Sequence, residues 1–499
     1  MAGFSGHFFF ITKLCKFRLP LSNKMKPKLK IFEEFSSNIL PHEARYLSTI
    51  ANFQDSEKQE IFNKLIHNAQ FPEQPEKNNS DIDKRKYHYI KNWVEQKLQQ
   101  RNVDDVGAWI LDFLKKISLD LVTAEEEKQM LDYIKSYRKI GYNFQVLYQV
   151  MREYRSYLLV RIRYDDHLIV LDFLERFSSQ FEKAVKIQQK LYIATDEITK
   201  QYTEKKTTSV YWERWLKKVF EGEEINGNNR YKAFVLLAFL YNTTKNAEKQ
   251  RDLFSKIDVY FSKGDLYSRR ILYNFYSNSV LLHSQLQDFE KAIYYGKLAV
   301  RQNNEDTLMY VNNLAASYLR TEKFREANQL MEAHRSVFEN SHNDYQRITF
   351  ISYELRILAE LGQLQKAENI GIYFLKKFES EIFEYRWHHF FTSYFQVLVE
   401  RESYATILQL DKKFNLENLA KKSSFIPNLS WAISLSNYME NRISKEELIS
   451  KISDSLQDLN ISKSNLYLVR KNVKMLSKIF RKLEVFLSRT FKFTIICST

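Results

Sequence analysis

The fold is decided by FEKAIYYGKLAV at Phe289–Val300, FREANQLMEAH at Phe324–His334 and LQKAENIGIYFL at Leu364–Leu375. Each segment places an alanine three residues after its first apolar residue, and each follows another segment with helical periodicity. The three alanines, 35 and 40 residues apart, are Ala292, Ala327 and Ala367. A period of this length built from paired helices indicates a helical repeat array.

The middle copy shows the packing that such a repeat requires. Three residues share one face of its first helix: Leu314, Ala315 and Tyr318. Three more share a face of its second helix: Phe324, Ala327 and Met331. The alanines permit a close helix crossing, and the polar turn 320–323 lets the chain fold back. One pair cannot bury its apolar face alone, so we expect the pairs to stack.

These residues resemble the tetratricopeptide repeat family. The matching positions in the copies before and after are Val280, Phe289, Ala292 and Ala299, and then Gly362, Leu364 and Ala367. The tyrosine at position 318 is replaced by His283 and Leu358, and the proline usual after the second helix is missing. The resemblance implies an all-α solenoid of antiparallel helix pairs, wound as a right-handed superhelix, behind an N-terminal helical region.

Composition and chain order divide the molecule. Only 10 glycines and 6 prolines occur in 499 residues, too few for strands joined by tight turns, so an all-α fold is expected. We predict a basic extension at 1–27, helices within 28–70, a linker at 71–83, and a helical region without clear repeats at 84–220. The repeat array is predicted at 230–460, after a boundary at 221–230, and a basic amphipathic capping helix with a tail at 461–499.

The net charge of +15 lies almost entirely in the two ends of the chain. Residues 1–32 carry seven basic residues and no acid, and residues 470–499 carry eight basic residues and one acid. Nucleic-acid binding requires a basic stripe across a folded surface, so this distribution argues against nucleic acid as a partner. The tails leave a membrane surface open as an alternative partner.

The cysteine content and the N-terminus bear on localisation. Cys15 and Cys497 are the two cysteines, which excludes a disulfide framework and indicates a reducing, cytoplasmic setting. The acid-free residues 1–25 could instead be an organelle transit segment, or translation could start at Met25.

No pattern of catalytic residues is present. The glycines lack phosphate-loop or dinucleotide-fold spacing, and no histidine pair has the zinc-protease pattern. His388 and His389 are adjacent, but neighbours on a helix point about 100° apart, so they do not readily chelate one ion. We therefore expect no enzymatic activity, no cofactor and no metal.

The resemblance implies a groove lined by the first helix of each pair. The groove residues, from three successive pairs, would be Ser277, Asn278 and Leu281, then Asn312, Asn313, Ala316 and Arg320, then Thr349, Ser352, Arg356 and Glu360. Asparagine amides can bond a partner's backbone, and Arg320 and Arg356 could bind a carboxylate. Family members that hold a terminal carboxylate use lysine and asparagine at the groove positions occupied here by Ser277 and Leu281, so that clamp is absent.

The leading hypothesis is a non-catalytic scaffold that binds a peptide or partner helix in this groove, with no small-molecule substrate. One alternative is a peptide-responsive regulator with residues 84–220 as its effector region. Another is a membrane-surface adaptor that uses the basic tails.

Overall fold

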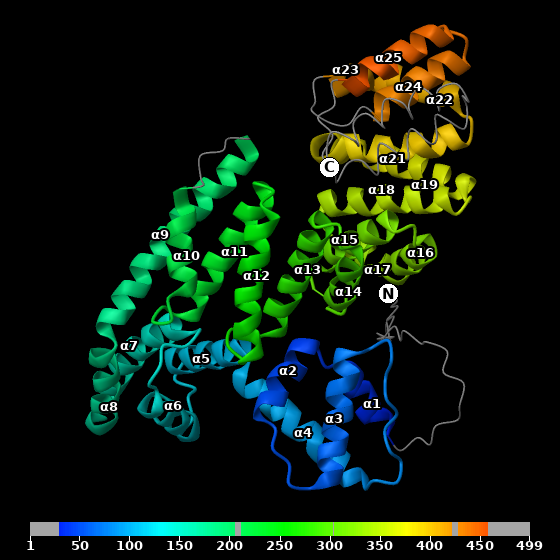
Figure 1. Cartoon of the computed structure of the whole chain (residues 1–499). Helices are drawn as coiled ribbons and strands as arrows, with labels where there is room; N and C mark the ends of the chain where they lie inside the picture. The colour runs from blue at the N-terminus through cyan, green and yellow to red at the C-terminus, as the bar shows by residue number, and fades with distance from the viewer. Residues whose placement is uncertain (1–28, 205–210, 303, 422–427, 458–499) are drawn as a thin grey trace, which may run out of the picture. The chain divides into compact units, whose positions relative to one another are not determined.

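The computed structural model describes residues 29–204, 211–302, 304–421 and 428–457 (Figure 1). Every regular element in these ranges is helical, which confirms the all-α prediction. Within the same ranges, no helix combines the length and the apolar character needed to cross a membrane. The basic extension at 1–27 and the predicted capping helix and tail at 461–499 lie outside the described residues.

The chain divides into two compact units, of residues 26–286 and of residues from Gln287 onward. The second unit contains the three segments that define the repeat. The predicted array at 230–460 is therefore shared between the units, because its first three helices belong to the unit that ends at Leu286.

The second unit consists of successive helix pairs. Its first helices are α15 (Thr307–Arg320), α18 (Asp344–Glu360), α21 (Trp387–Glu400) and α24 (Asn428–Met439). Its second helices are α14 (Phe289–Ala299), α16 (Phe324–Ala333), α19 (Leu364–Lys377), α22 (Tyr404–Phe414) and α25 (Lys445–Gln457). Figure 1 shows the first helices following one another through the unit.

The pairs pack in one recurring pattern. Each first helix contacts the first helix of the next pair. The contacting helices are α15 with α18, α18 with α21, and α21 with α24. The second helices α16, α19 and α22 each contact their own first helix and the next one. Each pair thus buries apolar surface that it could not bury alone, as expected of a helical array.

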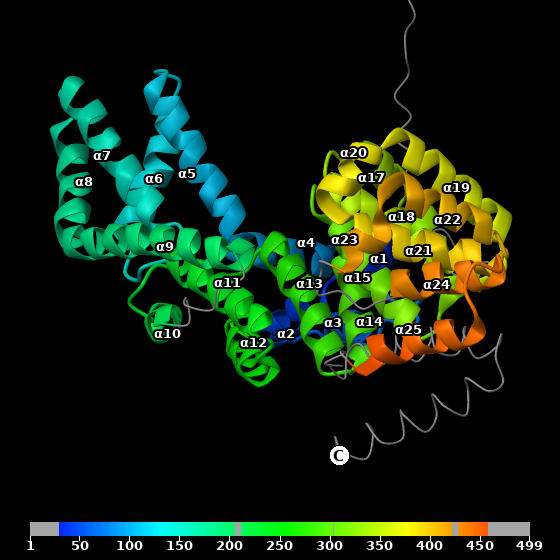
Figure 2. The same ribbon diagram turned by 90° about the horizontal axis from the view of Figure 1, so that it is seen from above.

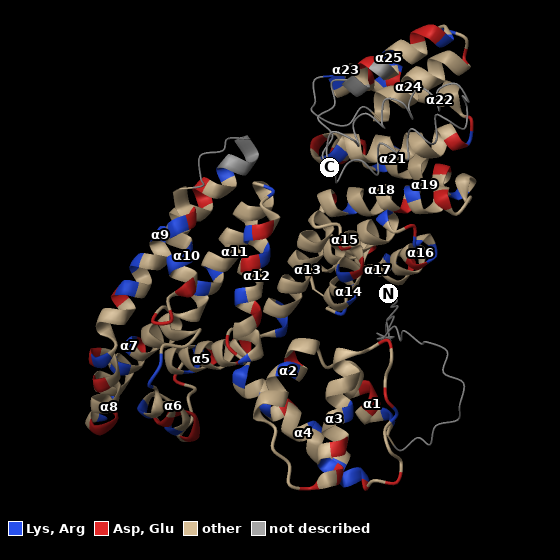
Figure 3. Ribbon diagram, in the orientation of Figure 1, with Lys and Arg blue, Asp and Glu red and all other residues tan. Residues whose placement is uncertain are grey.

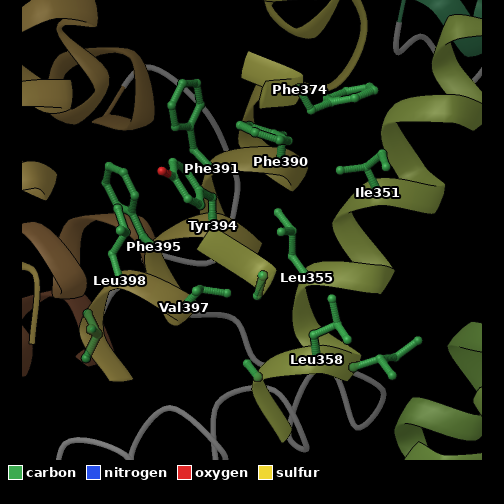
Figure 4. Close-up of a cluster of buried hydrophobic side chains, with 14 of the residues drawn as sticks. Ile351, Leu355, Leu358, Phe374, Phe390, Phe391, Tyr394, Phe395, Val397 and Leu398 are labelled. Carbon is green, nitrogen blue, oxygen red and sulfur yellow. The ribbon is translucent and has the colours of Figure 1, made fainter. Parts of the chain in front are cut away.

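Small residues lie where these helices approach most closely. Ala292, Ala327 and Ala367 are completely buried. Gly371 of α19 lies against Tyr394 of α21, so close that a Cβ atom at this glycine would be 2.4 Å from the tyrosine ring. Figure 4 shows the core between α18, α19 and α21, where aromatic and aliphatic side chains interdigitate. The small residues set the helix spacing and the large ones fill it.

The two helices of each pair are joined by the same turn. Each turn has one residue in the left-handed backbone region, with φ between 57° and 72°. These residues are Glu322, Gly362, Glu402 and Asn441. The amide of the next residue donates to a carbonyl five residues earlier, at 2.8–3.0 Å in Lys323–Tyr318, Gln363–Leu358, Ser403–Leu398 and Arg442–Asn437. This is the hydrogen bond of a Schellman motif, which ends one helix and reverses the chain.

The turns recur after 40, 40 and 39 residues, a longer period than the first two sequence copies indicated. The additional residues form short helices after the second helices. These are α17 (Arg335–Asn340), α20 (Glu379–Glu381) with the π-helical η2 (Ile382–Arg386), and α23 (Leu416–Lys421).

The first unit contains α1 (Lys30–Ser37), α2 (Pro41–Ile50), α3 (Ser56–Gln70), α4 (Lys84–Arg101), α5 (Val103–Ser118), α6 (Ala124–Ser136), α7 (Phe144–Val160), α8 (Tyr164–Arg176), α9 (Ser178–Glu204), α10 (Glu213–Glu221), α11 (Gly227–Thr243), α12 (Ala247–Ser262) and α13 (Arg269–Gln285). Figure 2 shows α7 and α8 side by side. Thr123 and Glu126 form a capping box at the start of α6.

The same reversal occurs in the first unit where the sequence shows no repeat. Left-handed residues Asp120 and Ile162 lie between α5 and α6 and between α7 and α8. The matching hydrogen bonds join Leu121 to Lys116 and Arg163 to Leu158, at 2.8 and 3.1 Å. Residues 103–176 are therefore built from helix pairs as well.

The segment 221–230, whose glycines and asparagines predicted a boundary, is largely buried from residue 225 onward, whereas Glu221, Glu223 and Glu224 are exposed. Asn229 and Arg230 are buried, and they donate hydrogen bonds to the carbonyls of Ala184 and Phe220. The Asn229 amide and the Arg230 guanidinium thus satisfy backbone carbonyls of neighbouring helices, which composition alone does not reveal.

A buried polar cluster attaches α2 to α12 and α13 within the first unit. His42 lies 2.6 Å from Asp258 through Nε2 and 2.8 Å from the Tyr276 hydroxyl through Nδ1. Arg45 donates two hydrogen bonds to the Asp258 carboxylate. Burial lowers the pKa of His42 against the opposing effect of Asp258. Burial alone would raise the pKa of Asp258, but its bonds to His42 and Arg45 lower it.

The buried carboxylate of Glu43 extends this attachment. Glu43 accepts hydrogen bonds from the Tyr267 hydroxyl and from Arg269, at 2.6 and 2.8 Å. Its other oxygen accepts from the backbone amide of Leu40, which caps α2. These bonds connect residues more than 200 positions apart, so sequence periodicity could not indicate them.

The turn geometry predicts opposite effects for two substitutions. Gly362→Ala places a side chain at φ +72° where a Cβ would contact nothing, so backbone strain should lower stability by about 1 kcal/mol. Glu322→Gly removes that strain at φ +58° and should raise stability by about 0.5 kcal/mol. Thermal unfolding followed by circular dichroism measures both. Equal changes of the unfolding temperature in the same direction for both variants would contradict the left-handed backbone geometry assigned to these turns.

The pKa of His42 predicts a pH dependence. Because the folded-state pKa of His42 lies below its unfolded value of about 6.5, the unfolded chain binds this proton more readily than the folded chain as the pH falls from 7 toward 5. Stability should therefore decline over this window, and the decline should be shallower in His42→Gln. The matched control is His88→Gln, at an exposed site on α4. Unfolding midpoints at several pH values test this, and parallel curves for wild type and His42→Gln would refute it.

Candidate binding face

Three consecutive first helices of the second unit expose one stripe of residues each. The stripes recur at three- and four-residue spacing, which is one face of a helix. They consist of Met309, Asn313, Ala316 and Arg320 on α15, of Gln346, Tyr353, Arg356 and Glu360 on α18, and of His389, Thr392, Gln396 and Glu400 on α21. We call these twelve residues the first-helix face.

Direct contacts connect the stripes of neighbouring helices. Gln396 donates to Glu360 at 3.1 Å, and the rings of Tyr353 and His389 meet edge to face at 5.2 Å. Next to the stripes, buried Asn312 donates to the backbone and the side-chain oxygen of Gln346, both at 2.9 Å. The face is therefore a preformed surface whose polar groups are held in fixed positions.

Four of the predicted groove residues are buried and do not present side chains on a surface. They are Ser277, Asn312, Thr349 and Ser352, with at most 4% of their surface exposed. Ser352 donates to the carbonyl of Ile348, and Thr349 accepts from Arg386 at 2.7 Å. Small polar side chains on these helices bond to the helix backbone or to the next helix, which the groove model did not anticipate.

The remaining predicted residues are partly or fully exposed. Asn313, Arg320, Arg356 and Glu360 belong to the first-helix face. Asn278 and Leu281 lie on α13, in the first unit, where Asn278 donates to the carbonyl of Asn274. Arg320 lies over the ring of Phe289, with its guanidinium carbon 6.0 Å from the ring centre.

The stripe on α21 was not predicted, although it includes the most unusual electrostatics of the face. Burial, followed by the positive charges of Arg386, Arg356 and His388, lowers the pKa of His389 well below its ordinary value. His389 is therefore neutral at pH 7. The available signal was the spacing of His389, Thr392, Gln396 and Glu400 in an otherwise aromatic helix.

The first unit, which does not contain this face, has a cavity of about 250 Å³ between α10, α11 and α12. Its lysines are paired with acids: Lys217 and Lys249 with Glu213 at 2.9 Å, and Lys256 with Glu221 at 2.8 Å. Figure 3 shows both signs of charge along α12. Because the charges compensate one another, the cavity offers no excess charge for an ionic ligand.

An exposed apolar patch lies at the turns after α5 and α7. Its most exposed members, from 57% to 79%, are Leu119, Leu121, Val160, Ile162, Tyr164 and Leu168. An ion pair between Asp120 and Arg161 connects the two turns. Ile162 has φ +56°, which is strained for a β-branched residue. Exposed apolar side chains gathered at two connected turns are typical of contact sites.

The described residues contain no group of three or more His, Cys, Asp or Glu side chains placed to hold a metal ion. Comparisons with protein-family models, with curated proteins and with solved structures found no match to this chain.

Proposed function

We propose that the second unit is a non-catalytic scaffold that binds a peptide or partner helix on the first-helix face. The observation that carries this proposal is the recurrence of one partly exposed polar stripe on each of α15, α18 and α21. A face built from equivalent positions of stacked helices can contact an extended ligand at several points. The tetratricopeptide-like pattern of the sequence supports the same function, and with it a solenoid architecture.

The chemistry of the stripes fits a peptide ligand. Asn313 and Gln396 have amides that can bond a peptide backbone, and Arg320 and Arg356 can bind carboxylates. Ala316 and Met309 leave space and apolar surface between the polar groups. Because the stripes are held by contacts between helices, little conformational entropy would be lost on binding.

A charge-reversal variant of the full chain tests the proposed face. Asn313→Asp, Arg320→Glu and Arg356→Glu together should remove most of the captured partner, at least about tenfold, since they replace donors by repelling charges. The measurement is affinity capture with quantitative mass spectrometry of the bound proteins.

The control for this experiment is Lys376→Glu with Lys377→Glu, two exposed residues on α19 outside the first-helix face. This variant should capture the same partners as wild type. An unchanged set of partners in the first variant would remove the face from the proposed function.

A second candidate function, a regulator with an effector region within 84–220, is favoured by the apolar patch. Residues 111–127 and 158–172 contain eight acidic and four basic residues, so the patch has an acidic surrounding. The occupant with complementary chemistry is a partner helix with one apolar face and basic flanks.

An amphipathic Leu/Lys helical peptide can probe this patch. Leu121→Ser with Val160→Ser should weaken its binding to the full chain about tenfold, because both residues are more than 60% exposed. The control is Tyr373→Ser on α19, because the Tyr373 side chain is also more than 60% exposed but lies outside the patch. Fluorescence anisotropy measures the affinities, and equal affinity in the double variant and wild type would exclude this surface.

A further inference from the structure

Two polar atoms on α21 lie buried without a hydrogen-bond partner among the described residues. They are Nε2 of His389 and Oγ1 of Thr392. The two residues are three positions apart, so they occupy the same side of the helix. An unpaired buried polar group costs about 1–3 kcal/mol, and each such group therefore requires an explanation. Both belong to the first-helix face, where a ligand would supply the missing partners.

The side chains beside these atoms are fixed in position. The ring of Tyr353 meets that of His389 edge to face, with an interplanar angle of 89°. Arg386, one turn before His389, donates to Thr349 at 2.7 Å, and its guanidinium carbon lies 4.4 Å from the ring centre of Tyr345. These contacts hold both the Arg386 guanidinium and the His389 imidazole against side chains of α18.

The charge around His389 is positive. The groups that act on its protonation are Arg386, Arg356 and His388, all of them bases. A neutral imidazole can still donate one hydrogen bond, through Nε2 in the appropriate tautomer. The threonine hydroxyl can donate another, and a guanidinium has five N–H donors. Hydrogen-bond donors beside basic side chains suit an anionic acceptor.

We infer that Arg386, His389 and Thr392 form a subsite for a carboxylate of the bound peptide. This inference rests on the proposed peptide-binding function and specifies the chemistry of the ligand. One carboxylate oxygen would accept from the Arg386 guanidinium and the other from Nε2 of His389, with Thr392 as a third donor. Arg356 adds positive charge from α18. The carboxylate belongs to an acidic side chain or to a chain terminus.

The test uses the full chain and fluorescently labelled octaglutamate with an amidated C-terminus, at about 0.15 M salt to weaken contacts with exposed charges. Amidated octaglutamine is the neutral comparison, and octaglutamine with a free C-terminus supplies a terminal carboxylate alone. Fluorescence anisotropy should show tighter binding of octaglutamate than of amidated octaglutamine. Tight binding of octaglutamine only when its terminus is free would assign the subsite to a terminal carboxylate.

Two variants isolate the subsite. Arg386→Gln and His389→Phe should each weaken octaglutamate binding about tenfold, and the phenylalanine preserves the ring contact with Tyr353. Arg386→Lys retains the positive charge but not the planar guanidinium with its several N–H donors, so it should bind octaglutamate more tightly than Arg386→Gln but less tightly than wild type. Lys376→Gln, at an exposed site on α19, should bind as wild type. Unfolding midpoints verify that each variant is folded.

The outcomes separate this inference from the proposed function. Unchanged octaglutamate affinity in folded Arg386→Gln and His389→Phe overturns the subsite. In that case, loss of the captured partner in the charge-reversal variant of Asn313, Arg320 and Arg356 would still support the first-helix face. If the charge-reversal variant keeps its captured partner while Arg386→Gln and His389→Phe lose octaglutamate binding, the carboxylate subsite stands and the peptide-scaffold function falls.

Discussion

The left-handed turn between paired helices is the constraint on which the rest of this structure depends. One residue with positive φ and one hydrogen bond spanning five residues end the first helix and direct the second back along it. Because the turn fixes the angle within a pair, the apolar faces of successive pairs meet in the same way. The turn recurs with glutamate, asparagine, isoleucine and glycine at its centre, so the geometry is conserved within the chain while the residue is not.

Stacking determines which side chains remain for a partner. On α18 and α21, most residues are buried against a neighbouring pair or against the other helix of the same pair. Beyond the first turn of each helix, a single stripe remains partly exposed, and even there hydrogen bonds and ring contacts connect the helices. The same contacts that stabilise the array therefore fix the donors that a ligand would meet, and they leave Nε2 of His389 and Oγ1 of Thr392 unsatisfied.

Sequence reasoning located the helices of the second unit well, because apolar periodicity and small residues at crossings are local signals. Ala292, Ala327 and Ala367 are all fully buried, and α14, α16 and α19 begin at the predicted residues. It located the candidate face less well. Ser352 and Thr349 fall at groove-like positions but are buried. Whether a polar residue is exposed depends on how closely the next pair approaches, which no single segment encodes.

The sequence by itself determined an all-α chain, the paired-helix repeat and the absence of recognisable catalytic motifs, since these follow from composition and from spacings within about forty residues. Only the tertiary structure decided the rest. It brought His42 and Glu43 to partners more than 200 residues away, divided the helices into two units, and placed Arg356 near His389. These are contacts between distant segments, and their specificity arises from packing geometry that local periodicity does not contain.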